Sequence, residues 1–116
     1  MTSSNLAIMT GVKIVVIYPH PTDEQAFERE WTEKHQPLVE EKLKGMTRFV
    51  AARVVGSPHG RVTAYRIAEA HFSNIAELNK CLESEGGKEV LAHAAAMSSG
   101  GAPIVLLCEE ESFIYW

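Results

Sequence analysis

One histidine in the N-terminal half of the chain has the surroundings of an acid or base beside a pocket. His35 lies in the segment AFEREWTEKHQPL, residues 26–38, four residues after one of the two tryptophans. At 100° per residue, with Phe27 as the reference direction, Leu38 falls at roughly 20° and Trp31 at about 40°. These three apolar residues predict a buried stripe on a helix. His35 falls at about 80°, at the edge of the stripe, where a cleft between helix and sheet would open.

A proline should interrupt the helix next to this histidine. Pro37 has no backbone N–H and disfavours helical geometry at Gln36, so a kink or pause is expected there. Carbonyl groups freed by the break would favour a protonated imidazole at His35. The pattern predicts a site residue at His35, although a histidine that caps the break or packs in the core would give the same pattern.

A second pair of chemically capable side chains lies in RVTAYRIAEAHF, residues 61–72. In an extended strand Tyr65, Ile67, Glu69 and His71 point to one face, and the last two are separated by ~7 Å. A carboxylate on a central strand must be paired, hydrated or protonated, and each state could serve proton transfer. A structural pair across a subunit interface fits equally well. The sequence leaves open which face of this strand meets the helices.

The other histidines and the cysteines carry weaker signals. His20 and His59 lie in turns and His93 lies among alanines, so we interpret all three as structural or solvated. Cys81 and Cys108 have no Cys-x-x-Cys spacing, so two free thiols are expected. No group of histidines or carboxylates has metal-ligand spacing, and no metal site is predicted.

Composition excludes several classes of partner. The 116-residue chain has a net charge of −4 and no basic cluster, so neither nucleic acid nor an anionic membrane surface is expected as a partner. Apolar content of 46% and charged content of 22% are ordinary for a soluble globular protein. The start lacks the features of a secretion signal, and no apolar run approaches the ~20 residues of a membrane span. A soluble cytoplasmic protein is expected.

The order of expected elements is β-α-β-β-α-β, after a flexible leader over residues 1–11. This order predicts a single domain over residues 12–116 with an α+β, ferredoxin-like fold, in which both helices cover one face of a four-stranded antiparallel sheet. Capping boxes at Thr22 and Asn74 open the two helical regions, and the EGGKE segment interrupts the second. Strands are expected over residues 12–18, 47–55, 61–72 and 104–111, and helices over residues 22–44, 74–84 and 90–97.

The predicted strands are apolar on both faces. In the first strand Val12, Ile14 and Val16 point to one side, and Val15 and Ile17 point to the other. A sheet with helices on one side would leave its second apolar face bare, which is rare in a monomer. A homodimer packed sheet against sheet is therefore expected, and the apolar tail SFIYW adds a further hint.

Three segments together resemble the EthD family, which is named after a small protein linked to bacterial ethyl tert-butyl ether degradation. They are VKIVVIYPHPTDEQAFEREWTEKHQPL, YRIAEAHF and LESEGGKEVLAHAAAM. The resemblance implies a dimeric α+β barrel of two ferredoxin-like subunits, with a pocket between helices and sheet. It supports His35 in HQPL, and Glu69 matches a recurrent acidic position. An acidic residue often stands in the family where this chain has His93.

Proteins that share this barrel include cofactor-free monooxygenases, polyketide cyclases, lactone isomerases and haem-processing enzymes. The resemblance thus implies a catabolic protein that binds a small apolar organic compound without a cofactor, as an oxidoreductase or an isomerase. A non-catalytic binding or accessory protein, or a structural dimer with a vestigial pocket, stays open as an alternative. The candidate catalytic residues are His35, Glu69 and His71, and the candidate substrate contacts are Phe27, Trp31, Tyr65 and Tyr18.

Overall fold

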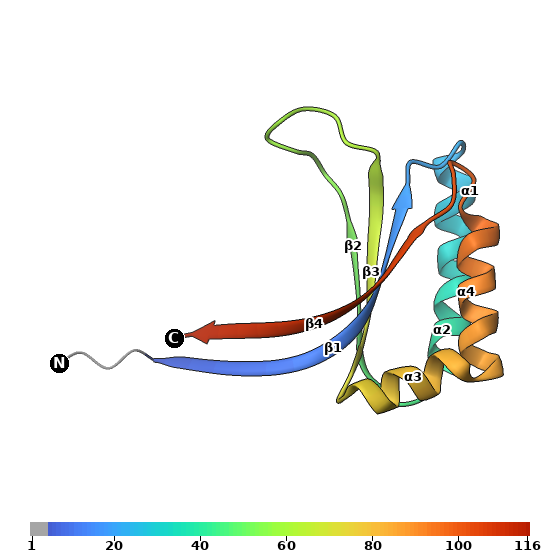
Figure 1. The fold of residues 1–116 in the computed structure, drawn as a ribbon. Helices are drawn as coiled ribbons and strands as arrows, with labels where there is room; N and C mark the ends of the chain where they lie inside the picture. Colours follow the sequence, from blue (N-terminus) through green and yellow to red (C-terminus); the bar gives the residue numbers. More distant parts are fainter. Residues whose placement is uncertain (1–4) are drawn as a thin grey trace.

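The computed structural model describes residues 5–116 (Figure 1). Four strands and a set of helices follow one another in the order that the sequence predicts. Their bounds are β1 (Leu6–Pro19), α1 (Glu24–Glu30), the π-helical turn η1 (Trp31–His35), α2 (Gln36–Lys42), β2 (Met46–Arg53), β3 (Ala64–Phe72), α3 (Ile75–Glu83), α4 (Glu85–Met97) and β4 (Ile104–Tyr115).

The strands form one antiparallel sheet in the order β2-β3-β1-β4. Val16 of β1 lies opposite Ala68 of β3 on one side and Val105 of β4 on the other. Ala51 of β2 lies opposite the same alanine. The predicted α+β ferredoxin-like topology is therefore confirmed, with β1 and β3 as the inner strands.

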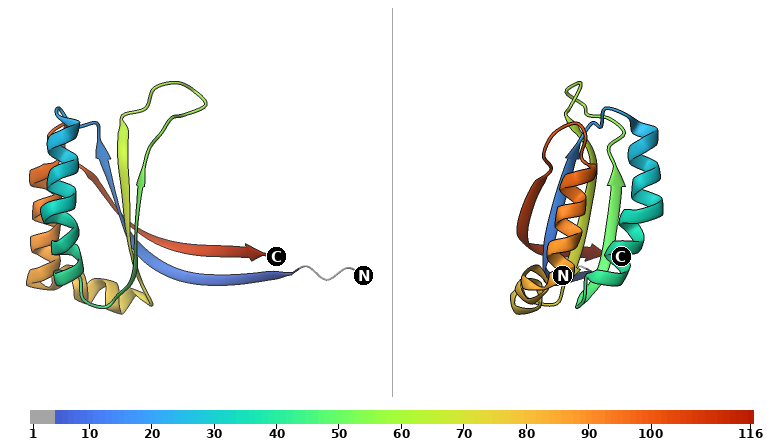
Figure 2. Two further views of the ribbon diagram at one scale, coloured as in Figure 1. Left: turned by 180° about the vertical axis from the view of Figure 1, so that it is seen from behind. Right: turned by 90° about the vertical axis from the view of Figure 1, so that its right-hand side faces the viewer.

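The helices cover one face of the sheet, as Figure 2 shows from the side. Valine, isoleucine and tyrosine alternate with outward-facing residues along β1, so every second side chain enters the core beneath the helices. The fully buried side chains include Tyr18, Phe72, Leu78 and Val39. This alternation fixes which face of β1 and β3 can contribute to a site under the helices.

Residues 6–11 are part of β1 rather than a loose leader, and residues 1–4 lie outside the described part. Leu6 to Gly11 pair only with Tyr115 to Glu110 of β4, because the pairing of β1 with β3 begins at Val12. The two strands thus continue beyond the sheet as a curved two-stranded arm (Figure 1). Ile8 and Phe113, which lie opposite each other in the arm, are each about half exposed.

The sheet face away from the helices and the outer strand β4 stay uncovered in the isolated subunit. Leu106 points to the open face, because its partner Val15 does so, and it is 45% exposed. Val105 points to the helical side but is 43% exposed, because the helices do not extend over β4 (Figure 2). An apolar surface of this kind is typical of a protein that has a partner.

The helices begin close to the predicted residues. Asn74 caps α3 by accepting a hydrogen bond from the Glu77 N–H, as predicted. The prediction of a capping box at Thr22 is wrong by one residue, because Asp23 caps α1 and accepts from the N–H of Ala26 at 3.1 Å. Aspartate and threonine can both cap a helix, so spacing alone did not separate the two adjacent positions.

The predicted interruption at EGGKE lies earlier in the chain, at Ser84. This serine ends α3 and caps α4, and the two glycines lie in the first turn of α4. Glycine is required there by close packing, since a Cβ on Gly87 would lie 2.0 Å from the carbonyl oxygen of Cys81. The thiols of Cys81 and Cys108 are free. Among the described helices, none is long and apolar enough to span a membrane.

Candidate functional site

His35 is presented by a π-helical turn that joins α1 to α2. Pro37, in the first turn of α2, cannot donate the hydrogen bond that an α-helix would require of it. In the wider turn, the N–H of Gln36 donates instead to the carbonyl of Trp31, five residues earlier. The predicted interruption therefore takes the form of a π turn, and the helix continues through it.

The π turn changes the direction in which His35 points. The extra residue in the turn moves each later side chain backward around the helix axis, so the buried positions are Phe27, Trp31, His35 and Val39, four residues apart. Leu38, predicted to be in the stripe, is only half-buried. His35 is 2% exposed and faces the core rather than the edge of the helix.

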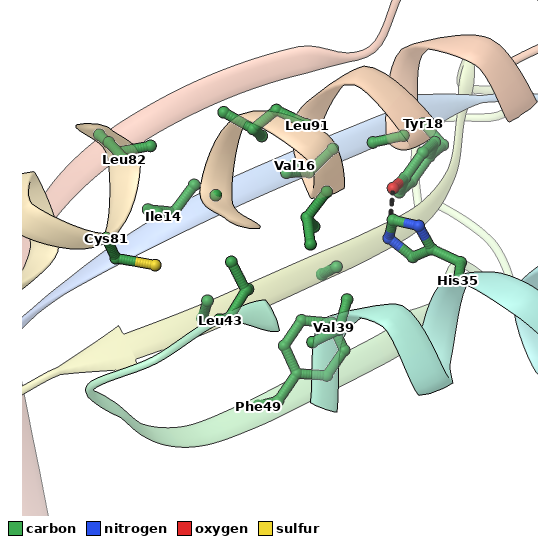
Figure 3. A pocket seen from close by; sticks show the side chains of 15 residues that line it. Ile14, Val16, Tyr18, His35, Val39, Leu43, Phe49, Cys81, Leu82 and Leu91 are labelled. Atoms are coloured by element: carbon green, nitrogen blue, oxygen red, sulfur yellow. Dashed lines mark hydrogen bonds between the residues drawn. The ribbon is translucent and has the colours of Figure 1, made fainter. Parts of the chain in front are cut away.

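A narrow cavity lies between the sheet and the helices, and His35 and Tyr18 close one end of it (Figure 3). Cys81 and Leu82 lie at the far end. The volume open to the centre of a water molecule is about 30 Å³, which is room for about two waters. Apart from His35 and Tyr18 the lining is apolar, and it consists of Ile14, Val16, Val39, Leu43, Phe49, Ala68, Ala70, Cys81, Leu82, Gly87, Val90, Leu91 and Ala94.

A chain of polar contacts leads from the cavity toward the surface. The Tyr18 hydroxyl lies 3.4 Å from Nε2 of His35. On the other side of the ring, Nδ1 of His35 lies 2.9 Å from Nδ1 of His93. Nε2 of His93 donates to Oε2 of Glu30 at 2.8 Å. The side chains of His93 and Glu30 are 21% and 34% exposed, so the chain begins in the core and ends in contact with solvent.

Burial sets the protonation states at the cavity. Burial, with a smaller contribution from the neighbouring His93, lowers the pKa of His35 to about 4, so its ring is neutral at pH 7. Burial raises the pKa of Tyr18 well above its usual value, so the phenol keeps its proton and can donate a hydrogen bond. The hydrogen bond from His93 lowers the pKa of Glu30, which is therefore a carboxylate. The cavity thus presents a neutral imidazole beside a neutral phenol.

Three of the predicted substrate contacts lie outside the cavity lining. Phe27, Trp31 and Tyr65 form an aromatic cluster beside Tyr18, with ring centroids 5.3 Å apart for Tyr18 and Phe27 and 5.4 Å apart for Phe27 and Tyr65. Trp31 contacts the His35 ring with centroids 5.1 Å apart, so it supports the histidine from behind. The predicted apolar wall of Trp31 and Phe27 therefore does not line the cavity, whereas Tyr18, also predicted as a substrate contact, does.

A β-bulge explains why Tyr65 does not follow the predicted alternation. The register between β1 and β3 shifts at Tyr18 and Pro19, which leaves Tyr65 as the extra residue. Tyr65 is consequently buried under α1, where its hydroxyl donates to Glu28 at 2.6 Å. Its neighbour Arg66 donates to the same carboxylate at 2.6 Å and lies 4.4 Å from the centre of the Trp31 ring.

Glu69 and His71 lie on the opposite face of the sheet from His35. Glu69 pairs with Val15 of β1, whose neighbours Ile14 and Val16 enter the core. The prediction that Glu69 or His71 assists His35 is therefore wrong within one subunit. The alternation along the strand was predicted correctly, but the assignment of its faces was not fixed by the sequence.

On that open face the two residues belong to a compact charged cluster. Lys13 lies 2.9 Å from a carboxylate oxygen of both Glu69 and Glu110 and lowers the pKa of each. His71 places its two ring nitrogens 3.0 and 3.1 Å from the same two carboxylates. Glu69, His71 and Glu110 are close enough to share a cation, since one ligand atom of each lies within 4.8 Å of the others. The Lys13 ammonium already supplies the positive charge between the carboxylates.

The sequence reasoning missed His93 and Glu30. His93 was interpreted as structural, and Glu30, which lies 3.8 Å from Lys34, was not predicted as a site residue. Two features of the sequence could have indicated these residues. Glu30 and His35 lie on one predicted helix, and His93 is the only histidine in the second helical region. The contact between the two helices that brings them together could not be derived from local spacing.

Comparisons with known proteins agree with this fold. The chain is 30% identical over 98 residues to an uncharacterised 11.0 kDa protein from the thcB–thcC intergenic region of Rhodococcus erythropolis, and the match covers 84% of this chain and 94% of that protein. An EthD family protein from Bacillus halodurans, solved by crystallography, is 28% identical with a TM-score of 0.78. That match covers 86% of this chain and 98% of the other.

A more distant structure shares the fold alone. It is a dimeric ferredoxin-like protein of unknown function from Jannaschia, 14% identical with a TM-score of 0.63, and the match covers 84% of this chain and 98% of that chain. The model of the EthD domain matches residues 19–100, which include η1, β3 and α4. The chain therefore belongs to the EthD family.

Proposed function

We propose that the protein is an enzyme that removes a proton from a small, largely apolar carbonyl compound, with His35 as the base. The observation that carries the proposal is the pair of polar groups at one end of an otherwise apolar cavity, His35 Nε2 and the Tyr18 hydroxyl. Proton removal is the first step of both cofactor-independent isomerisation and cofactor-independent oxygenation. It is therefore common to the two reaction types that the sequence predicts, and it needs no bound cofactor.

The two groups would act on adjacent atoms of the substrate. The Tyr18 O–H would donate a hydrogen bond to the carbonyl oxygen, and His35 Nε2 would take a proton from the neighbouring carbon. The electron pair of the C–H bond would move into a carbon–carbon double bond, and negative charge would develop on the oxygen that Tyr18 contacts. The 3.4 Å between the two groups is long for a hydrogen bond, so a substrate can replace that contact at little cost.

The size of the cavity restricts the ligand. The cavity volume of about 30 Å³ holds about two waters. A typical ligand site is much larger, at roughly 300–1,000 Å³. A compound as large as cyclohexanone or acetophenone would enter only if the helices moved away from the sheet. The small volume favours the alternative of a structural dimer with a vestigial pocket, and the test below separates the two.

The direct test is hydrogen exchange into the substrate. Cyclohexanone and acetophenone are incubated with the protein in D₂O, and loss of the α-proton signals is followed by NMR against buffer alone. We expect protein-dependent exchange that falls about 100-fold or more in His35→Asn and also falls in Tyr18→Phe. Exchange that persists in His35→Asn would refute the role of His35. Saturable binding of the probes without exchange would instead support a non-catalytic binding protein.

The EthD name of the family, taken from ethyl tert-butyl ether degradation, supports a place in a catabolic pathway for small organic compounds. A second comparison supports a homodimer, since the Jannaschia protein, which shares this fold, is described as dimeric. The uncovered apolar face of the sheet supports it independently. We infer that two subunits pack through these faces.

Two matched substitutions on β4 test the dimer. Leu106 points to the open face and Val105 to the other, and both are almost equally exposed. Leu106→Lys should convert the protein to a monomer in sedimentation, whereas Val105→Lys should leave the dimer intact. A wild-type protein that sediments as a monomer at micromolar concentration would contradict the proposed assembly.

A further inference from the structure

The contacts of His35 continue through two more side chains on other helices. Glu30 is the last residue of α1, His35 ends η1, and His93 lies in the middle of α4. The planes of the two imidazole rings differ by 16° and their centroids are 5.1 Å apart. Because Nδ1 of one ring lies 2.9 Å from Nδ1 of the other, the rings meet edge to edge in nearly one plane. This is the geometry in which a proton can be shared between two ring nitrogens.

We propose that His93 and Glu30 form a proton relay with His35, through which a proton taken up in the cavity is balanced by a positive charge on His93. This inference rests on the proposed function of His35 as a base. It adds two positioning residues that do not touch the substrate.

The count of donors and acceptors selects one arrangement of protons in the resting site. A carboxylate only accepts hydrogen bonds, so Nε2 of His93 donates to Glu30. In a neutral His93 the other nitrogen, Nδ1, is then an acceptor, and Nδ1 of His35 must donate to it. Nε2 of His35 is left without a proton and faces the Tyr18 hydroxyl and the cavity. The relay thereby holds His35 in the tautomer that a base requires.

The relay also solves the problem of a base in an apolar site. A positive charge on His35 itself is unfavourable, because burial lowers the pKa of its ring to about 4. When Nε2 gains the proton of the substrate, Nδ1 can pass its own proton to His93. The charge then lies on a ring that is partly in contact with solvent and is paired with the Glu30 carboxylate. Returning the proton to the product reverses both transfers, so no proton is gained or lost.

The charged and titratable groups around the relay are few. Tyr18 faces His35 from β1, and Glu30 and His93 face it from α1 and α4. Lys34 of η1 is mostly exposed and lies 3.8 Å from the Glu30 carboxylate. The lysine partly offsets the charge of Glu30, but the shorter contact of Glu30 is the one with His93.

The test is a measurement of tautomers by NMR, which needs no substrate. In ¹⁵N-labelled protein at pH 7.5, long-range ¹H–¹⁵N correlations should show His35 with its proton on Nδ1 and a bare Nε2. On acidification, the first proton taken up by the two rings should appear on His93. A proton on Nε2 of His35 in the resting protein, or a first positive charge on His35, would overturn the relay.

Glu30→Gln keeps a side-chain oxygen that can accept from His93 but removes the charge. It should lower the pKa at which the pair of rings takes up its proton by about 1 or more. Glu33→Gln is the matched control, because Glu33 is exposed on the same helical segment and makes the same change in net charge. An equal effect of the two substitutions would overturn the relay. If the tautomer is as expected but no probe exchanges its protons, the proposed function fails while the relay stands.

Discussion

Replacing His35 with asparagine should remove a large part of the acid sensitivity of folding between pH 7 and pH 5. The native ring is neutral with a pKa of about 4, whereas a histidine in the unfolded chain has a pKa near the ordinary value of about 6.5. Between these two values the unfolded state binds more protons than the native state, so stability falls as the pH falls. Asparagine does not titrate, so the variant lacks this contribution.

The size of the effect follows from the two pKa values. Linkage gives a loss of about 2 kcal/mol at pH 5 relative to pH 7, rising to about 3 kcal/mol below pH 4. Carboxylates with lowered pKa, such as Glu28 and Glu30, stabilise the fold above their unfolded pKa and lose that effect only as the pH falls below about 4.5. The range from pH 7 to pH 5 therefore excludes these carboxylates, and the comparison of the two proteins removes the contribution of the histidines that they share.

The assay is urea unfolding of the wild type and of His35→Asn at pH 7, 6 and 5, at one protein concentration because a dimer shifts the midpoint with concentration. The two proteins can differ in stability at pH 7 for other reasons, and the quantity that matters is the difference between their pH slopes. If the two free energies of unfolding fall in parallel as the pH is lowered, His35 is not a buried neutral imidazole and the reasoning about the site is refuted.

Two further substitutions test the local structure that positions the site. Asp23→Ala should destabilise the fold by about 1 kcal/mol because it removes the cap of α1, while Thr22→Ala, next to it, should have little effect; circular dichroism during thermal unfolding measures both. Gly87→Ala should cost about 1–3 kcal/mol because its Cβ would meet the Cys81 carbonyl, and Gly56→Ala, with open space around it, should be nearly neutral in the same experiment. Equal effects within either pair would contradict the packing described for that segment.

The fold could be predicted from local patterns because its elements differ clearly in period. The run that contains Val16 is β-branched and ends at a proline-rich turn, whereas the helical segments carry caps and an apolar stripe at helical spacing. Boundaries were less certain, as Asp23 shows, because two adjacent residues can both cap the helix. The strand over residues 6–11 was missed because it pairs with the distant end of the chain.

The site could be predicted only in part. His35 stood out through the nearby tryptophan and proline, but its direction was predicted with 100° per residue, and the π turn that Pro37 accompanies adds a residue to the turn. The faces of β3 depend on how the sheet packs against the helices, which one strand does not encode. The role of His93 could not be derived from local spacing, since it depends on a contact between α4 and η1 that arises only in the folded chain.

The most direct test of the central claim is to locate a bound carbonyl compound by NMR. With acetophenone present, intermolecular nuclear Overhauser effects should connect the ligand to the methyl groups of Ala68 and Ala94, which line the cavity, while the imidazole signals of His35 shift. Contacts confined to Ile67 and Val15, on the open face of the sheet, with no change at His35, would contradict the claim that the chemistry takes place beneath the helices.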